Sequence, residues 1–264
     1  MSYLEIPLWR VAIAALLVGV AILLSRLARL GLEKALGLGA VRAAVQLVAI
    51  GYALRLLITS NHPAIVALVL GVMWAVAAYT SAQRLEHGPS TAALFPYALA
   101  SIGVGALFAL APVFLFVIPV QSLDARYVIP LGGMILSSAM NVVALVFERL
   151  FATAAAEEAT LEQRLALGAS PRQALASYER AALRAALIPT INGLVTVGLV
   201  ALPGMMTGQI LSGVAPEQAV RYQIVIMYQV VAVAAVSGAL AATFSRRLLF
   251  TERAQLRSWR ADRR

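Results

Sequence analysis

Amide, hydroxyl and thioether side chains interrupt the most apolar stretches of this sequence. The amides and the hydroxyl are Asn141, Asn192, Thr207, Gln209, Gln223 and Gln229, and the thioethers are Met134, Met140, Met205 and Met206. Such groups can bind a solute weakly on its way through a membrane. An amide in a membrane helix more often bonds a neighbouring helix, however, and methionine often fills gaps in packing. These residues are therefore candidates for a transport pathway, with packing as the alternative.

Arg42 and Gln46 form a further polar pair. They are four residues apart, so they share one face of a helix and can act together. Arg42 can equally anchor its helix at the membrane surface, because a long basic side chain reaches from an apolar segment to water.

The sequence shows no permanent metal site. It has no cysteine, an apolar stretch separates His62 from His87, and no pair of acidic residues lies within an apolar stretch. Stable metal sites need several such ligands together. The ligands of a transported metal are therefore unknown, and the absence of acid pairs and of a serine–histidine arrangement also argues against an enzyme within the membrane.

The one long charged segment, 151–184, has the pattern of two helices joined by a sharp turn. Gly168 can end a helix in the left-handed conformation, Ser170 can cap the next helix, Pro171 suits its first position, and Gln173 completes a capping box. One interpretation is an amphipathic helix that rests on the membrane surface. The other is a coupling element that docks on a partner protein. Its candidate contact residues are Glu162, Arg164, Gly168, Ala169, Ser170 and Pro171.

The composition predicts an all-α, polytopic membrane protein. The chain is 61% hydrophobic and 12% charged, and its mean hydropathy is +0.86, which is too apolar for a soluble domain. About 20 apolar residues are needed to cross a bilayer as a helix. Seven stretches qualify: 8–27, 39–59, 63–83, 94–118, 127–147, 185–211 and 222–245. The second is the weakest, because Arg42 and Arg55 lie within it.

The basic residues predict the orientation, because they collect on cytoplasmic loops. With the N-terminus outside, only Arg10, Arg55, Arg126 and Arg221 of the 21 basic residues lie outside, which leaves 17 inside. The C-terminus is then cytosolic. The net charge of +9 follows from this topology, so no nucleic-acid partner is expected.

The chain divides into four parts on this topology. Residues 1–150 form five transmembrane helices, 151–185 the cytosolic coupling helices, 186–247 the last two transmembrane helices, and 248–264 a basic cytosolic tail. A helix over 187–202 is only about 24 Å long, so Pro203 and Gly204 are expected to break it at membrane depth. Irregular backbone at that depth favours a pathway lining, and a proline kink between packed helices is the alternative.

Two resemblances bear on function. The spacing Glu162-Gln-Arg-x-x-x-Gly168 resembles the cytoplasmic loop with which permeases of ATP-binding cassette (ABC) transporters engage their ATPase, although the downstream proline, Pro189, stands farther away than is usual. The second involves longer blocks: RAAVQLVAIGYAL from Arg42, GMILSSAMNVVAL from Gly133 and LPGMMTGQILSGVAPEQAVRYQIVIMY from Leu202. Together they resemble the small ABC permeases that include the bacterial iron exporter permease FetB and plant aluminium-tolerance relatives.

The second resemblance implies a permease that pairs with itself and with two separate ATP-binding subunits, in a bacterial cytoplasmic (inner) membrane. Iron export is the function it favours, although the charged loop is similar to that of importers. A non-metal substrate such as a sugar nucleotide, or a membrane scaffold without transport, are the alternatives. The small residues Gly238 and Ala242 allow close helix approach, either across a dimer or within the chain.

No nucleotide-binding loop is present to power transport. The pattern G-x-x-x-x-G-K-[ST] does not occur, and the only lysine, Lys34, follows no such glycine pattern. The chain is therefore expected to be a transport subunit and no enzyme, with no cofactor of its own and with ATP and Mg²⁺ on a partner subunit.

Overall fold

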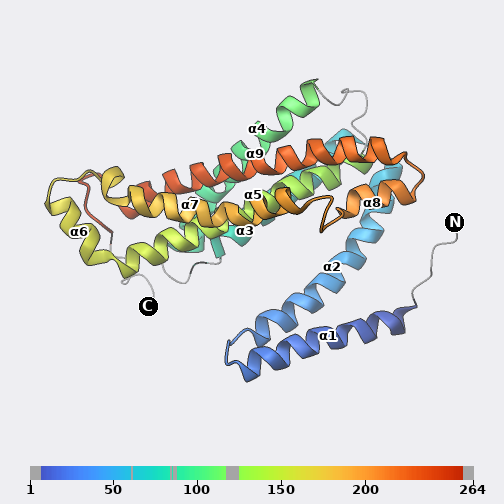
Figure 1. Cartoon of the computed structure of the whole chain (residues 1–264), viewed down its shortest axis with the longest axis horizontal. Helices are drawn as coiled ribbons and strands as arrows, with labels where there is room; N and C mark the ends of the chain where they lie inside the picture. The colour runs from blue at the N-terminus through green and yellow to red at the C-terminus, as the bar shows by residue number, and fades with distance from the viewer. Residues whose placement is uncertain (1–6, 61, 84, 86–87, 117–124, 258–264) are drawn as a thin grey trace. The chain divides into compact units, whose positions relative to one another are not determined.

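The computed structural model describes residues 7–60, 62–83, 85, 88–116 and 125–257, and in this part of the chain all regular structure is helical (Figure 1). Six of the described helices are long and apolar enough to cross a membrane. This confirms the predicted all-α, multi-span membrane protein. The described chain separates into two compact units, 1–61 and 62–264, and each is described by itself.

The first unit is a helical hairpin of α1 (Leu8–Leu27) and α2 (Glu33–Ser60). Its turn uses positive φ at Arg29 (54°) and Gly31 (71°). The buried Ser25 holds the turn, because its hydroxyl donates to Glu33 Oε1 (3.1 Å) and accepts from the Leu32 N–H (3.2 Å). Most apolar side chains of the hairpin are exposed, among them Leu17 at 73%, as suits helices whose solvent is lipid or other apolar protein.

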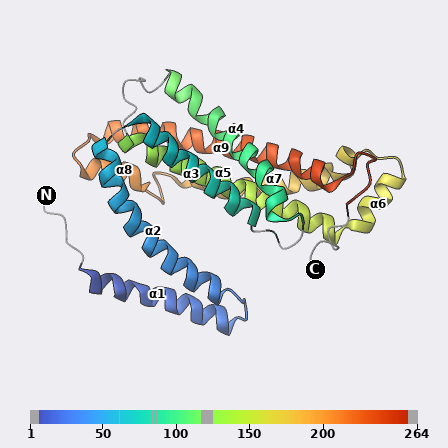
Figure 2. The same ribbon diagram turned by 180° about the vertical axis from the view of Figure 1, so that it is seen from behind.

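The second unit is built around four long helices, α3 (Pro63–Gln83), α4 (Thr91–Phe116), α5 (Ala125–Ala156) and α9 (Pro216–Leu249). In Figures 1 and 2, α5 and α9 run side by side, and the two helices pack against each other along their length. α4 packs on α3 and α9, and α3 packs on α5. The centre of this unit is fully buried and apolar, with Ile102, Ile135, Phe147 and Val233 at 0% exposure.

Small residues set the spacing of these helices. A Cβ atom on Gly238 would lie 2.9 Å from Val142 Cγ1 and 3.2 Å from Leu183 Cδ2, so α9 approaches α5 and α7 closely at this glycine. Ala242, one turn later, is also buried inside the unit. The predicted small-residue pair therefore packs within the chain, and this surface is not free for a second copy.

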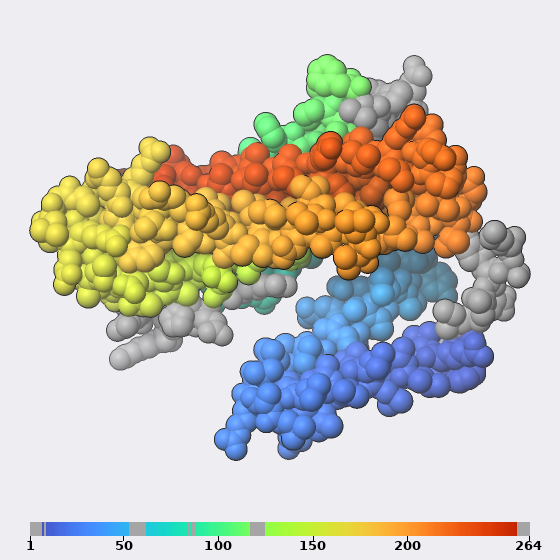
Figure 3. Space-filling view, in the orientation of Figure 1, coloured from blue at the N-terminus to red at the C-terminus, as the bar shows by residue number. Residues whose placement is uncertain are grey.

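Three shorter or amphipathic helices complete the second unit: α6 (Glu158–Ala166), α7 (Pro171–Thr196) and α8 (Gly204–Leu211). Figure 3 shows α7 and α8 exposed along one face of this unit. α7 packs on α5 and α9, and α8 packs on α9.

The expected span over 185–211 is not one continuous helix. α7 ends at Thr196, and residues 197–203 form an irregular turn in which Gly198 has φ of 82° and its N–H donates to the Ala201 carbonyl (3.0 Å). The break therefore begins before Pro203, which instead precedes α8 as its N-cap. The physical reason is the extended backbone at Val197 (φ −61°, ψ 132°), which ends α7 earlier than the proline would, and the left-handed Gly198 then continues the turn.

Other helices match the predicted spans or extend them. α1 and α3 have the predicted bounds, whereas α5 continues to Ala156, past the point at which the charged segment was expected to begin. After α9 the chain folds back, and the Arg257 N–H donates to the Leu249 carbonyl (2.8 Å). The start of the predicted basic tail is thus attached to the helical unit.

Candidate functional site

A groove of about 670 Å³ opens between α5, α7 and α9. Residues from all three helices line it, together with Pro203 from the turn before α8. The lining residues are Pro130, Gly133, Met134, Ser137, Ser138, Asn141, Val142, Leu145, Ala186, Pro189, Thr190, Pro203, Gln223, Ile226, Met227 and Val230. The groove combines an apolar surface with a few amides, hydroxyls and thioethers, which is the usual make-up of a small-molecule site.

The groove brings together some of the predicted pathway residues. Met134 and Asn141 of α5, Pro203, and Gln223 of α9 all line it. Met140 packs against the buried core instead, and Gln229 is buried with its Nε2 donating to the Ala109 carbonyl (3.3 Å). For Gln229 and Met140 the structure therefore favours the packing alternative.

Six further candidates are not among the lining residues: Asn192, Gly204, Met205, Met206, Thr207 and Gln209. Asn192 is an exposed residue near the end of α7, and the others belong to α8. Met206 is buried, and the Thr207 hydroxyl donates to the Pro203 carbonyl (3.1 Å), an intrahelical bond of the kind that hydroxyls make in apolar helices. Arg42 and Gln46 lie on α2 in the first unit, both exposed.

Sequence reasoning missed four polar or sulfur-bearing residues of the groove, Ser137, Ser138, Thr190 and Met227. A signal for two of them was present, because Met134, Ser137, Ser138 and Asn141 fall at helical spacing and so form one face of α5. Thr190 follows Pro189 on α7 with no such pattern around it.

Gln223 is the least exposed polar residue of the groove. It is 6% exposed, and its Oε1 has no hydrogen-bond partner among the described residues. A buried acceptor without a donor costs about 1–3 kcal/mol. Among the described residues, Gln209 Oε1, Gln229 Oε1 and Ser237 Oγ are buried without a partner in the same way, and none of these three residues lines the groove. Native structures retain such groups where a ligand, an ion or water completes them, so Gln223 is the one of the four that a groove ligand could complete.

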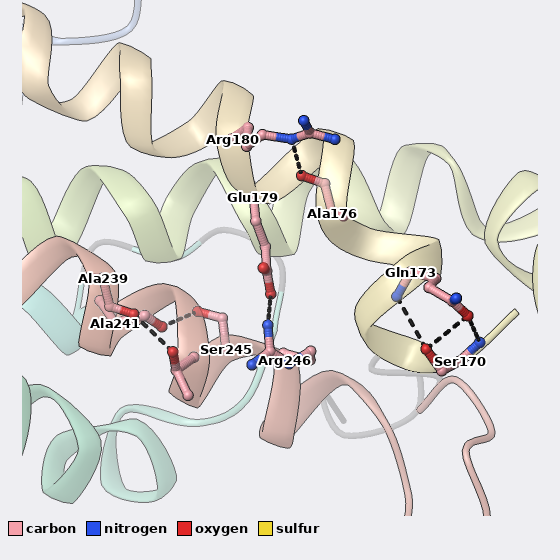
Figure 4. A network of polar contacts seen from close by, with 10 residues as sticks. Ser170, Gln173, Ala176, Glu179, Arg180, Ala239, Ala241, Ser245 and Arg246 are labelled. Atoms are coloured by element: carbon pink, nitrogen blue, oxygen red, sulfur yellow. Dashed lines mark hydrogen bonds and ion pairs between the residues drawn. The ribbon is translucent and has the colours of Figure 1, made fainter.

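The second candidate site is the turn between α6 and α7. Gly168 has φ of 90°, its N–H donates to the Leu165 carbonyl (2.9 Å), and the Ala169 N–H donates to the Arg164 carbonyl (3.0 Å). This is the hydrogen-bond pattern of a Schellman motif. Ser170 then caps α7: the Gln173 N–H donates to its hydroxyl (3.3 Å), and its own N–H donates to Gln173 Oε1 (2.9 Å), as Figure 4 shows. Pro171 occupies the first turn of α7. The turn predicted from the sequence is confirmed.

Arg164 holds the two helices of this hairpin together. Its Nη1 donates to the Ala174 carbonyl (2.9 Å) and to the Ser177 hydroxyl (3.3 Å), and its guanidinium lies 5.1 Å from the centre of the Tyr178 ring. The arginine therefore stabilises the hairpin from within. The residues left exposed in and around the turn include Glu162, Gly168 and Leu167, the last at 87%.

An ion pair attaches the hairpin to the long helices. Arg246 Nη1 of α9 lies 2.6 Å from Glu179 Oε1 of α7, and both side chains are largely buried (Figure 4). Because α7 also packs on α5 and α9 and itself lines the groove, a shift of the hairpin as a rigid body moves one wall of the groove.

The described residues contain no group of three or more histidine, cysteine, aspartate or glutamate side chains that could hold a metal ion. Of the two histidines, His62 lies just before α3, and His87 lies outside the described residues. No metal ligands can therefore be assigned.

Comparison with known proteins places these features in context. The model of an uncharacterised protein family, UPF0014, matches residues 8–250. The chain is 36% identical to the probable iron export permease protein FetB of Escherichia coli, over 93% of each chain. It is 35% identical to the UPF0014 membrane protein YjkA of Bacillus subtilis, over 97% of this chain and 99% of that one. It is 32% identical to the protein ALUMINUM SENSITIVE 3 of Arabidopsis thaliana, over 94% and 89%. No solved structure matches.

Proposed function

This chain belongs to the UPF0014 family of membrane proteins, and we propose that it is the membrane-spanning permease subunit of an ABC transporter. The family resemblance expected from the sequence is confirmed, since the iron export permease of E. coli and the aluminium-sensitivity protein of A. thaliana are both relatives. The chain is accordingly a multi-pass membrane permease. The partner that supplies the energy, the transported substrate and the membrane in which the chain lies are what we propose.

The observation that carries the proposal is the hairpin of α6 and α7. Its tip has a left-handed glycine and an exposed leucine, and Arg164, the Ser170 capping box and the Glu179–Arg246 ion pair make it rigid. A conformational change in a motor subunit is transmitted to the membrane helices only through a rigid element. Leu167 is an apolar anchor of the kind that interfaces bury at their centre, and Glu162 and Gly168 lie beside it.

We assign the rest of the machinery by the same logic. The chain has no nucleotide-binding loop, so ATP and Mg²⁺ are bound by a separate ATP-binding cassette subunit. Two copies of the permease and two motors form the transporter in the bacterial cytoplasmic membrane, and no nucleic acid takes part. Export of iron is the transport that we propose, because the FetB relative bears that name. A non-metal substrate remains the second candidate, because no metal-ligand cluster is present in the described residues.

The hairpin can be tested at Gly168. Its φ of 90° is strongly disfavoured for a β-branched residue, while open space surrounds it. We expect Gly168→Val to reshape the turn and to lower transport-coupled ATP hydrolysis at least tenfold, in proteoliposomes that contain the chain and its ATP-binding subunit. Membrane insertion should be unchanged, because the long helices form independently of this turn.

Gly71→Val is the matched control. Gly71 lies inside α3 and also has open space around it, but its φ is not positive, so the same substitution should leave ATP hydrolysis near the wild-type rate. Glu162→Ala should have a milder effect than Gly168→Val. If Gly168→Val binds the motor and transports at the wild-type rate, the hairpin is a surface element and the coupling role is wrong.

A further inference from the structure

The wall of the groove carries no formal charge. Among the described residues that line it there is no aspartate, glutamate, histidine, lysine or arginine. Its polar groups are the amides of Asn141 and Gln223, the hydroxyls of Ser137, Ser138 and Thr190, and the sulfurs of Met134 and Met227. These groups exchange hydrogen bonds and soft contacts with a neutral molecule, but they neutralise neither a bare cation nor a polyanion.

An ion in this groove would be poorly compensated. A charge that leaves water needs a partner of opposite sign or a shell of strong ligands, and within a membrane that need is greater still. Bare Fe²⁺ prefers imidazole, carboxylate or water ligands, whereas the groove offers amide, hydroxyl and thioether groups. A doubly charged phosphate ester would meet no arginine or lysine there.

The size of the groove points the same way. A bare metal ion is held by a few ligands at about 2.0–2.6 Å, so its site is far smaller than a groove of about 670 Å³. Sites for organic molecules have volumes of about 300–1,000 Å³. This open groove therefore has room for a molecule with many non-hydrogen atoms.

Gln223 indicates whether the ligand should donate or accept a hydrogen bond. It lines the groove, it is 6% exposed, and its Oε1 accepts no hydrogen bond from any described residue. That atom is itself shielded from solvent, so a ligand with an O–H or N–H group supplies the missing donor where the amide turns into the groove, and an aprotic ligand cannot supply it at all. The groove therefore favours a solute with hydroxyl or amide donors.

We propose that the substrate of this groove is an uncharged organic molecule with hydroxyl or amide groups, and that a metal ion enters it only at the centre of a neutral complex of such molecules. This rests on the proposed transport function and specifies its substrate class. The feature that carries it is the meeting of Asn141, Thr190 and Gln223, from three helices, on one charge-free wall. Export of iron and export of an organic molecule are then the same transport reaction, because the iron leaves the cell inside the organic complex.

The test presents one metal in three charge states. The full-length chain, purified into nanodiscs without a motor subunit, is dialysed to equilibrium against radioactive iron as bare Fe²⁺ without oxygen, as anionic ferric citrate, and as neutral ferric tris-kojate, whose ligands carry hydroxymethyl donors. Ferric tris-maltolate, neutral but without those donors, is the fourth probe. We expect saturable binding of tris-kojate, at least tenfold weaker binding of tris-maltolate, and no saturable binding of the two charged forms.

Two variants locate the binding, each with a matched control. Gln223→Leu should weaken tris-kojate binding at least tenfold, whereas Gln229→Leu, which changes an equally buried glutamine of the same helix outside the groove, should not. Asn141→Asp, which adds a negative charge to the wall, should weaken tris-kojate and gain binding of Fe²⁺. Asn192→Asp, on α7 but outside the groove, should do neither.

Several results would overturn the proposal. They are saturable binding of Fe²⁺ or ferric citrate by the unchanged chain in preference to tris-kojate, no saturable binding of tris-kojate, and tris-kojate binding that Gln223→Leu and Asn141→Asp leave unchanged. None of these bears on the motor, because no ATP-binding subunit is present in the nanodiscs. A failure of the coupling role, shown by Gly168→Val, leaves the groove measurements valid.

Discussion

At the scale of single residues, Arg164 was predicted to contact a partner protein, but in the structure it stabilises the hairpin. Its place between Glu162 and Gly168 suggested contact with a partner, yet its guanidinium is used inside the hairpin by Ala174, Ser177 and Tyr178. Glu162 and Leu167 stay exposed. Spacing along the chain predicts the turn but not which of its side chains turn inward, because that depends on the return path of α7.

Arg164→Ala should loosen the hairpin without unfolding the long helices. The two hydrogen bonds are partly exposed, so their loss should cost about 1 kcal/mol of local stability, or roughly fivefold faster amide exchange. Hydrogen exchange read by mass spectrometry over 158–180 measures this directly. Arg172→Ala, at an exposed arginine on the first turn of α7, is the control and should leave exchange near the wild-type rate. Equal protection in both variants would mean that Arg164 does not brace the hairpin.

At the scale of elements, helix ends were predicted well where charges or prolines bound an apolar run and poorly where the backbone alone decides. α1 and α3 begin and end as expected, because Pro7, Arg26, Pro63 and Arg84 stand near their ends. The end of α7 was misplaced, since the extended backbone at Val197 and the positive φ at Gly198 leave no mark in hydropathy. Only some of the residues that line the groove were predicted. Polar residues in apolar helices can be recognised in a sequence, but which of them face one another depends on how three helices pack.

Gly198→Ala should destabilise the break before α8. Its φ of 82° is left-handed, where an alanine costs about 1 kcal/mol or more. Gly193→Ala is a control of opposite sign, because Gly193 is helical with open space around it and alanine there should stabilise α7 by about 0.5–1 kcal/mol. The midpoints of thermal unfolding in nanodiscs should therefore move in opposite directions. If Gly198→Ala raised the midpoint as Gly193→Ala does, the left-handed conformation at position 198 would not be required for the break.

At the scale of the whole molecule, the described helices show how many candidate membrane spans they contain, and the basic residues predict the orientation of these spans in the membrane. Six of the described helices qualify by length and composition, and α7 with α8 is a further, broken apolar segment. The ends of α9 are far apart, with Glu217 in its first turn and Arg253 beyond its last residue, so a spanning α9 puts these two residues on opposite sides of the membrane.

Orientation can be measured with single cysteines, because the natural chain has none. In intact cells, an impermeant thiol reagent should label Glu217→Cys and leave Arg253→Cys unlabelled until the membrane is opened. Both residues are exposed, so access to reagent is limited by the membrane alone. Labelling of the cysteine at position 253 in intact cells, with position 217 protected, would invert the orientation and would place the hairpin away from any cytosolic motor.

The path of α7 has a thermodynamic consequence. Its 26 residues begin at the Ser170 cap beside the hairpin tip, and Ala186, Pro189 and Thr190 of its second half line the groove. Two ligands that bind different parts of one such helix share a single coupling free energy, and the effect is reciprocal. A solute that tightens the attachment of the motor to the hairpin must, by the same factor, be held more tightly once the motor is attached. A solute that fits the groove without altering α7 would occupy it and leave ATP hydrolysis unaffected.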